Sequence, residues 1–126
     1  MKLNKGLSLL SLATRAGKTK SGNFQTEQAV KSGTAYLVII AADASENTKK
    51  KFRNMCSFYD VPILFYADQD TLGHAMGKEF RTSAAVTDAG FADEIKKQLT
   101  VEKLIEKFNS LNMLDALDDE LAFSAQ

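Results

Sequence analysis

Tyr36-Leu37-Val38-Ile39-Ile40-Ala41-Ala42 is a near-continuous apolar run, and this stretch decides the fold class. A run of this length and composition is typical of a β-strand that is buried on both faces. Such a strand needs a layer of other elements on each side, and those layers are usually helices. Helical patterns stand both before and after the run, so we expect an α/β fold built as a three-layer sandwich.

Three further strands are expected around this one. Val61-Pro62-Ile63-Leu64-Phe65-Tyr66 is a second apolar run, and the only proline of the chain stands near its start, where a missing donor is tolerated. Ser83–Val86 is a strand of small residues, and Lys18–Lys20 is a short candidate strand.

Helices are expected between the strands, each with a start or stop signal. The first repeats Leu3, Leu7 and Leu10 at helical spacing and stops at Gly17. The second helix is capped by Ser21 or Asn23 and runs to about Ser32, and the third is capped by Asp43 or Ser45, with Phe52, Met55, Cys56 and Tyr59 as its buried stripe. The fourth is a short helix near Thr71–Met76. The fifth is capped by Asp88 and has Phe91, Ile95 and Leu99 on its inner face.

Composition bounds the class of protein. The chain has 126 residues, 44% apolar and 25% charged, which is ordinary for one globular domain. No stretch approaches the ~20 apolar residues that span a bilayer, so no membrane partner is expected. The single cysteine, Cys56, permits no internal disulfide and suits a reducing compartment, so we expect a cytoplasmic protein.

The sequence lacks the motifs of several common enzyme and metal sites. Gly17-Lys18-Thr19 resembles part of a nucleotide phosphate loop, but Leu12 stands where that loop needs another glycine. His74 and Cys56 are the only residues of their kinds, which does not support a zinc site. No Gly-x-Ser-x-Gly elbow supports a nucleophilic serine. We therefore expect no enzyme, no metal and no cofactor.

The segment from Arg15 to Gln28 carries the strongest functional signal. Five cations and no acidic residue precede Glu27, and the last of these cations stand just before an expected helix start. A helix N-terminus offers free N–H groups and partial positive charge, so the segment is a candidate phosphate site. Its amide side chains can also read base edges. Phe24 is either a core anchor or an exposed stacking platform.

A second basic cluster follows on the expected third helix, where Lys49, Lys50, Lys51 and Arg53 stand close together. We interpret this cluster as a solvated helix face rather than a binding surface. Glu46 stands four residues before Lys50 and is expected to pair with it.

The chain resembles the L7Ae family of small ribosomal and RNA-binding proteins, and within it the bacterial YlxQ-like branch. The matching pieces fall within residues 1–99 and occur in the family's order. They are Leu9-Leu10-Ser11-Leu12-Ala13-Thr14-Arg15-Ala16-Gly17-Lys18, Asp43-Ala44-Ser45-Glu46-Asn47-Thr48, Leu72-Gly73-His74-Ala75-Met76-Gly77-Lys78-Glu79 and Ala85-Val86-Thr87-Asp88-Ala89-Gly90-Phe91-Ala92. The resemblance implies an α-β-α sandwich with a four-stranded mixed sheet. It also implies binding to structured RNA, which in many members is a kink-turn.

The resemblance also implies where RNA is contacted. Kink-turn binders show Gly-Thr-Asn-Glu-x-x-Lys at the start of the second helix, where this chain keeps Gly22 but has Phe24, Gln25 and Gln28 in place of the last three named residues. We therefore expect RNA binding, whereas these exchanges do not support the family's kink-turn specificity. The second contact is the loop before the last strand, here Gly77-Lys78-Glu79-Phe80-Arg81. The expected RNA-binding residues are Lys18, Lys20, Ser21, Gly22, Asn23, Phe24, Gln25, Gln28, Lys78, Phe80 and Arg81.

The C-terminal part of the chain differs from the rest in charge. Residues 1–100 carry 14 Lys/Arg and 10 Asp/Glu, a net +4, whereas residues 101–126 carry 2 and 6, a net −4. We divide the chain into an RNA-binding domain, residues 1–99, and an acidic extension, residues 100–126, which is either an amphipathic helix or a frayed end. The expected partner is structured RNA, ribosomal RNA among the candidates. The alternative is a protein-interaction or oligomerisation module that uses the extension to bind a protein or a second copy.

Overall fold

The computed structural model describes residues 3–124, with side chains through residue 111. Within this range the chain forms five helices and four strands. In chain order they are α1 (Lys5–Arg15), β1 (Thr19–Ser21), α2 (Asn23–Lys31), β2 (Leu37–Ile40), α3 (Glu46–Tyr59), β3 (Ile63–Phe65), α4 (Gln69–Ala75), β4 (Ser83–Val86) and α5 (Ala89–Ser124).

The four strands form one mixed sheet with the order β1-β4-β2-β3. β2 runs parallel to β3, whereas β4 is antiparallel to both of its neighbours, β1 and β2. Every residue of β2 is buried, as the continuous apolar run predicts. β3 lies at an edge of the sheet, which explains why Pro62 is tolerated just before it. The four expected strands and the mixed sheet are thereby confirmed.

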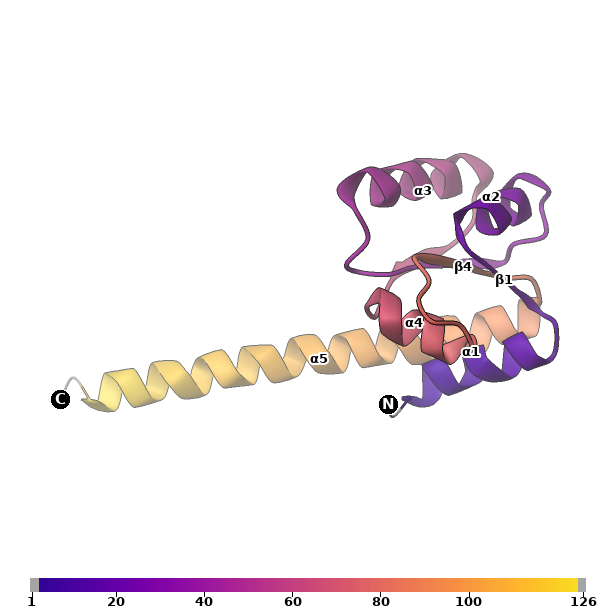
Figure 1. Ribbon diagram of the computed structural model, residues 1–126. Helices are drawn as coiled ribbons and strands as arrows, with labels where there is room; N and C mark the ends of the chain where they lie inside the picture. The colour runs from indigo at the N-terminus through magenta and orange to yellow at the C-terminus, as the bar shows by residue number, and fades with distance from the viewer. Residues whose placement is uncertain (1–2, 125–126) are drawn as a thin grey trace.

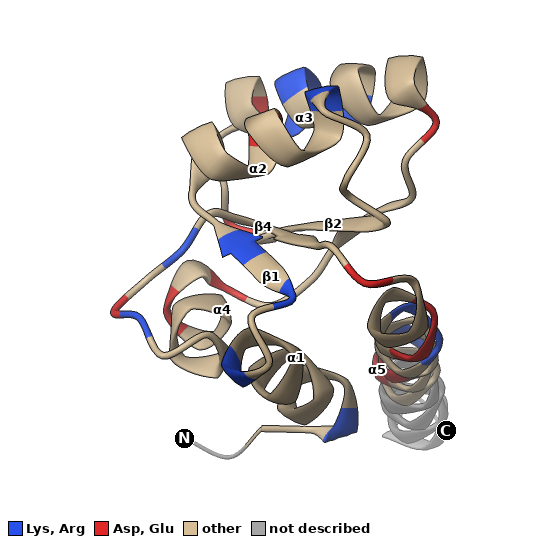
Figure 2. Ribbon diagram, turned by 90° about the vertical axis from the view of Figure 1, so that its right-hand side faces the viewer, with Lys and Arg blue, Asp and Glu red and all other residues tan. Residues whose placement is uncertain are grey.

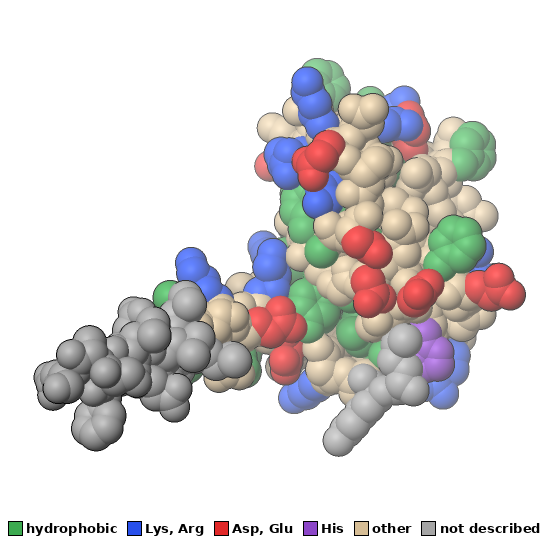
Figure 3. Space-filling model, turned by 60° about the vertical axis from the view of Figure 1, so that its left-hand side comes forward, with side chains coloured by type: hydrophobic (Ala, Val, Ile, Leu, Met, Phe, Trp, Pro, Cys, Tyr) green, Lys and Arg blue, Asp and Glu red, His purple; other side chains and the backbone are tan. Residues whose placement is uncertain are grey.

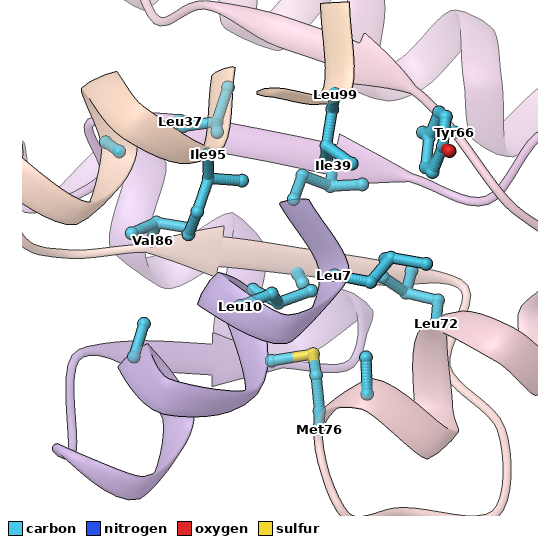
Figure 4. Packing of buried hydrophobic residues seen from close by; sticks show 14 of the residues in the cluster. Leu7, Leu10, Leu37, Ile39, Tyr66, Leu72, Met76, Val86, Ile95 and Leu99 are labelled. Atoms are coloured by element: carbon cyan, nitrogen blue, oxygen red, sulfur yellow. The ribbon is translucent and has the colours of Figure 1, made fainter. Parts of the chain in front are cut away.

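Helices cover both faces of the sheet, which makes the three expected layers (Figure 1). α1, α4 and α5 lie on one face, where Leu10, Ile95 and Leu99 pack against Ile39 and Val86 of the sheet (Figure 4). α2 and α3 lie on the other face and form a second, smaller core with Val38 and Ile40. The alternation of β2 side chains therefore supplies both cores, since neighbouring residues of a strand point to opposite faces.

The helix caps confirm some expectations and correct others. The Ser45 hydroxyl accepts a hydrogen bond from the backbone N–H of Thr48, and the Asp88 carboxylate accepts one from Phe91, so both act as N-caps. Neither Ser21 nor Asn23 caps α2, whose N-cap is Gly22 and which has no side-chain cap hydrogen bond. The physical reason is that Gly22, which has no side chain, occupies the N-cap position, while the side chains of Ser21 and Asn23 bond to partners elsewhere in the fold.

The buried stripe expected on α3 is shorter than its spacing suggests. Phe52 and Cys56 are buried and Met55 is half-buried, but the side chain of Tyr59 is 42% exposed. Tyr59 is the last residue of α3, after which the chain turns at Asp60 with φ +58°, so it lies beyond the part of the helix that covers the sheet. Burial raises the pKa of the Cys56 thiol to about 11, which fits the expected packed thiol.

The last helix is continuous from Ala89 to Ser124 and passes position 99 without a break. This favours the helical reading of the extension over a frayed end through Ser124. Ala92, Ile95 and Leu99 are buried in the core, whereas the apolar side chains that follow, up to Leu111, are about half exposed. None of the helices within the described residues combines the length and apolar character needed to cross a membrane.

Phe52 and Phe58 on α3 offer a matched test of the smaller core. Phe52 is 0% exposed and Phe58 is 82% exposed. We expect Phe52→Ala to lower the free energy of unfolding by about 3–5 kcal/mol, because it leaves a cavity in a closed core. Phe58→Ala should change it by about 0.5 kcal/mol or less. Urea denaturation followed by circular dichroism measures both, and equal effects would contradict the assigned packing.

Candidate nucleic-acid interface

The turn between β1 and α2 presents an open helix N-terminus. Gly22 has φ +89°, a conformation that favours glycine, and its backbone carbonyl accepts the first helical hydrogen bond, from Thr26. Among the described residues, none accepts a hydrogen bond from the backbone N–H groups of Asn23, Phe24 or Gln25. Free N–H groups at a helix start, together with the helix dipole, favour an anion such as phosphate.

The side chains of Ser21 and Asn23 connect this turn to the segment around β4. The buried Ser83 hydroxyl donates a hydrogen bond to Asn23 Oδ1 at 2.6 Å. Arg81 Nε donates to the Ser21 hydroxyl at 3.1 Å. These two contacts hold the turn against the loop that precedes β4.

That loop is fixed in turn by α4. The Gln69 backbone carbonyl accepts a hydrogen bond from the Arg81 N–H at 3.0 Å, and its side chain accepts one from the Thr82 hydroxyl at 3.1 Å. Gly73 approaches the backbone of Phe80 so closely that a Cβ at position 73 would collide with it. The position of Phe80 therefore depends on the missing side chain at Gly73.

The turn and the loop together line a hollow of about 270 Å³. Its lining residues are Ser21, Gly22, Asn23, Phe80, Arg81 and Thr82. Phe80 is 54% exposed at this hollow, so its ring is accessible to a planar group. Basic segments occur on β1 and on the loop from α4 to β4 (Figure 2). The fold thus brings the two expected contact regions together, although about sixty residues separate them.

A second hollow of about 250 Å³ lies along α2. It is lined by Lys20, Gln25, Gln28, Ala29, Ser32 and Thr34. A lysine and two glutamine amides therefore face one space. This combination can neutralise a phosphate and form hydrogen bonds with base or sugar groups.

Three of the expected residues line neither hollow. Lys18 precedes β1, and its backbone N–H donates to Ala13 at the end of α1. Lys78 is exposed at the start of the loop. Phe24 is 75% exposed on the first turn of α2, which excludes the core-anchor reading and leaves the stacking reading.

Charges behind the interface are largely compensated. Glu27 of α2 pairs with Lys31 at 2.8 Å and with Lys51 of α3 at 2.9 Å. Hydrogen bonds from these two lysines lower the pKa of the Glu27 carboxyl to about 2. On α3, Glu46 pairs with Lys49 at 3.5 Å, and the expected pair with Lys50 is not among the ion pairs of the described residues. Lys49 and Lys51 of α3 thus have acidic partners, whereas no ion pair of the described residues includes Lys50.

Groups that could act in catalysis are scattered. His74 lies at the surface, where it is the purple side chain in Figure 3, and the Cys56 thiol is buried. Within the described residues, no three His, Cys, Asp or Glu side chains are grouped so that they could hold a metal ion.

Comparison with known proteins identifies the family. A family model described as "Ribosomal protein L7Ae/L30e/S12e/Gadd45 family" matches residues 4–96. The chain belongs to this family. The family is non-enzymatic, which agrees with the expectation from the residue patterns. Residues 97–126 lie outside the matched range.

Relatives within the family include bacterial and archaeal proteins. The chain is 41% identical over 87 residues to the RNA-binding protein YlxQ of Bacillus subtilis, covering 69% of this chain and 87% of the relative. It is 37% identical to YlxQ of Enterococcus faecium, covering 74% and 89%. It is 31% identical to the large ribosomal subunit protein eL8 of Cenarchaeum symbiosum, covering 77% and 78%. The expected YlxQ-like branch is confirmed.

Solved structures share the fold. A protein of unknown function from Bacillus halodurans superposes with a TM-score of 0.74 at 38% identity, covering 76% of this chain and 97% of that one. A 15.5 kD RNA-binding protein of Giardia lamblia has a TM-score of 0.66 at 23% identity, covering 80% and 92%, and shows the likeness of fold.

Sequence reasoning missed the residues that position the interface. Gln69, Gly73 and Ser83 do not line the hollow at the turn, but they hold the turn and the loop in place. Gly73 stands in the Leu72-Gly73 pair that carries part of the family resemblance, so its presence was visible. Its role was not, because a close approach between two backbones leaves no periodic signal in a sequence.

Gly73→Ala tests whether α4 positions the loop. We expect the added methyl group to lower the free energy of unfolding by about 1–3 kcal/mol and to displace Phe80, since it meets backbone that cannot rotate away. The neighbouring His74→Ala, on the exposed side of the same helix, should change stability by about 0.5 kcal/mol or less. Urea denaturation and the amide chemical shifts of Phe80 and Arg81 report both effects. Unchanged shifts in the Gly73 variant would refute this role.

Proposed function

We propose that this protein binds structured RNA through the β1–α2 turn, the first two turns of α2 and the loop before β4. The observation that carries the proposal is the junction itself, where an uncapped helix N-terminus and a loop with Phe80 and Arg81 line one hollow. Membership of a family whose relatives include proteins named as RNA-binding supports it.

Each part of the interface has a chemical task in this proposal. Free N–H groups at the start of α2, with Lys18, Lys20 and Lys78, hold phosphates. Gln25 and Gln28 form hydrogen bonds with base edges or 2′-hydroxyls. Arg81 already donates to Ser21 and to the Phe80 carbonyl, so it orders the loop and adds positive charge rather than reading a base.

The proposed RNA specificity follows from the side chains that differ from those of kink-turn binders. Phe24 cannot form the hydrogen bonds of the asparagine it replaces, and Gln28 lacks the cation of a lysine. The exposed Phe24 ring instead offers a stacking surface beside the helix start. We therefore propose recognition by charge, shape and stacking, with weak preference for kink-turns.

Ribosomal RNA is the first candidate ligand, because the matched eL8 relatives are proteins of the large ribosomal subunit. A cytoplasmic location belongs to the same proposal, since the single cysteine suits a reducing compartment. The division into residues 1–99 for RNA and residues 100–126 for another task is also part of it, and the family match to residues 4–96 supports that boundary.

A salt-dependent titration tests the RNA function. We expect binding to a kink-turn RNA and to a plain duplex of equal length, with log K falling against log[salt] at a slope of roughly −2 to −5, as for ~3–5 neutralised phosphates. Lys18→Ala/Lys20→Ala should weaken binding to both RNAs and reduce the slope by about 2.

The control removes the same charge elsewhere, with Lys50→Ala/Lys96→Ala on α3 and α5, and should leave the slope nearly unchanged. A strong kink-turn preference would contradict the proposed weak specificity. Absence of binding to either RNA at low salt would overturn the RNA function and favour the protein-interaction alternative.

Stacking is tested separately on the two exposed rings. We expect Phe24→Ala and Phe80→Ala each to weaken RNA binding by about 1–3 kcal/mol, the usual contribution of a base stacked on an aromatic side chain. Phe58→Ala removes a ring that is still more exposed, at 82%, but lies on α3, and it should leave binding unchanged. Fluorescence anisotropy with a labelled RNA measures all three. Equal losses in the three variants would count against a local stacking role.

A further inference from the structure

Two hydroxyl groups line the far end of the hollow along α2, and the proposed function has no task for them. Ser32 is the C-cap residue of α2, and Thr34 follows it after one glycine. Both side chains line the same hollow of about 250 Å³ as Lys20 and Gln28. Both residues are exposed, so a ligand in the hollow can reach their hydroxyl groups.

The end of α2 holds these two groups, the hydroxyl pair, close together. Gly33 has φ +77°, which favours glycine, and after this turn the backbone N–H of Thr34 donates to the Ala29 carbonyl at 3.0 Å. The Ser32 and Thr34 hydroxyl oxygens are 3.0 Å apart. They lie 3.3 and 3.2 Å from the same Ala29 carbonyl oxygen, to which both can donate.

The hydroxyl pair therefore presents acceptors rather than donors to the hollow. Each hydroxyl group has one proton and two lone pairs, and the Ala29 carbonyl takes up the protons. The lone pairs that remain can accept a hydrogen bond from a ligand. The partial negative charge at the C-terminal end of a helix adds to this preference, and it disfavours a phosphate at this position.

The other end of the hollow has the opposite preference. β1, which carries Lys20, lies beside α2 (Figure 2), and Lys20 stands two residues before Gly22, the N-cap of α2. None of the ion pairs of the described residues includes Lys20. Gln25, Gln28 and Ser32 are three and four residues apart, so they stand along one side of the helix. The hollow thus offers a cation near the start of α2 and hydrogen-bond acceptors near its end.

We propose that the hydroxyl pair accepts a hydrogen bond from a ribose 2′-hydroxyl of the bound RNA, while Lys20 holds a phosphate of the same strand. This inference rests on the proposed RNA function and names the group of the RNA that the end of α2 recognises. Phosphates and 2′-hydroxyls alternate along the backbone of RNA, and the wide, shallow minor groove of an RNA helix displays the 2′-hydroxyls at its surface. A surface with a cation and an acceptor pair therefore fits this backbone.

A base amino group is the other common donor of a nucleic acid. It lies deeper in a groove than the backbone does, and the short side chains of Ser32 and Thr34 reach less far than those of Gln25 and Gln28. The glutamines are therefore the residues for base edges, and the hydroxyl pair is the one for the sugar. Since DNA has no 2′-hydroxyl, this contact favours RNA over DNA.

Titration of two matched duplexes tests the contact. One is a plain RNA duplex, and the other has the same sequence with 2′-fluoro sugars, which keep every phosphate and the sugar conformation of RNA but have no 2′-hydroxyl proton. Ser32→Ala/Thr34→Val should bind the RNA duplex about fivefold more weakly than the wild-type chain does, the effect of about one net hydrogen bond. Its affinity for the 2′-fluoro duplex should equal that of the wild-type chain, because the donor is already missing there. The slope of log K against log[salt] should not change, because no charge is removed.

The control makes the same chemical changes outside the interface. Ser57→Ala/Thr100→Val lies at exposed positions of α3 and α5, and it should leave the affinity for both duplexes unchanged. Both variants should keep the melting temperature of the wild-type chain. An equal loss for the two duplexes in the Ser32/Thr34 variant, or no loss for either, would overturn the 2′-hydroxyl contact and leave the RNA function standing. A wild-type chain that binds neither duplex at low salt would overturn both.

Discussion

The structure depends on the complete burial of β2 between two layers of helices. Leu37–Ile40 alternate between the two faces, so one short strand contributes to both cores. Burying both faces requires helices on each side, and it places β3 and β4 beside β2 to satisfy its backbone hydrogen bonds. β1 then pairs with β4 at one edge of the sheet, and the helices cover its two faces.

The candidate interface is a consequence of that sheet order. β4 inserts between β1 and β2, which brings the loop before β4 to the end of β1 where α2 begins. Hydrogen bonds from Arg81 to Ser21 and from Ser83 to Asn23 then join the two segments. Gly22 at the N-cap position offers no side chain to the helix start, and the first N–H groups of α2 have no acceptor among the described residues, so they are available to an anion. The residues of the turn between β1 and α2 thus both join the two segments and leave the start of α2 open.

α5 has two different environments along one helix. Its first turns complete the larger core through Ile95 and Leu99, and its later turns carry an apolar stripe that the domain does not cover. The family match ends at residue 96, so the stripe belongs to a part of the chain outside the shared fold.

The sequence by itself determined the fold class, the order of the elements and the family, and it singled out the two segments of the candidate interface. These features follow from local periodicity, from turn residues and from motifs whose members stand close together in the chain. The sequence left open whether the Phe24 ring is buried or exposed. It misassigned the cap of α2, the burial of Tyr59 and the partner of Glu46. Only the tertiary structure decided these points, because each depends on contacts between residues distant in sequence or on where an element ends relative to the sheet. The same reason explains the roles of Gln69, Gly73 and Ser83: their effect is exerted across the fold, and no local pattern records it.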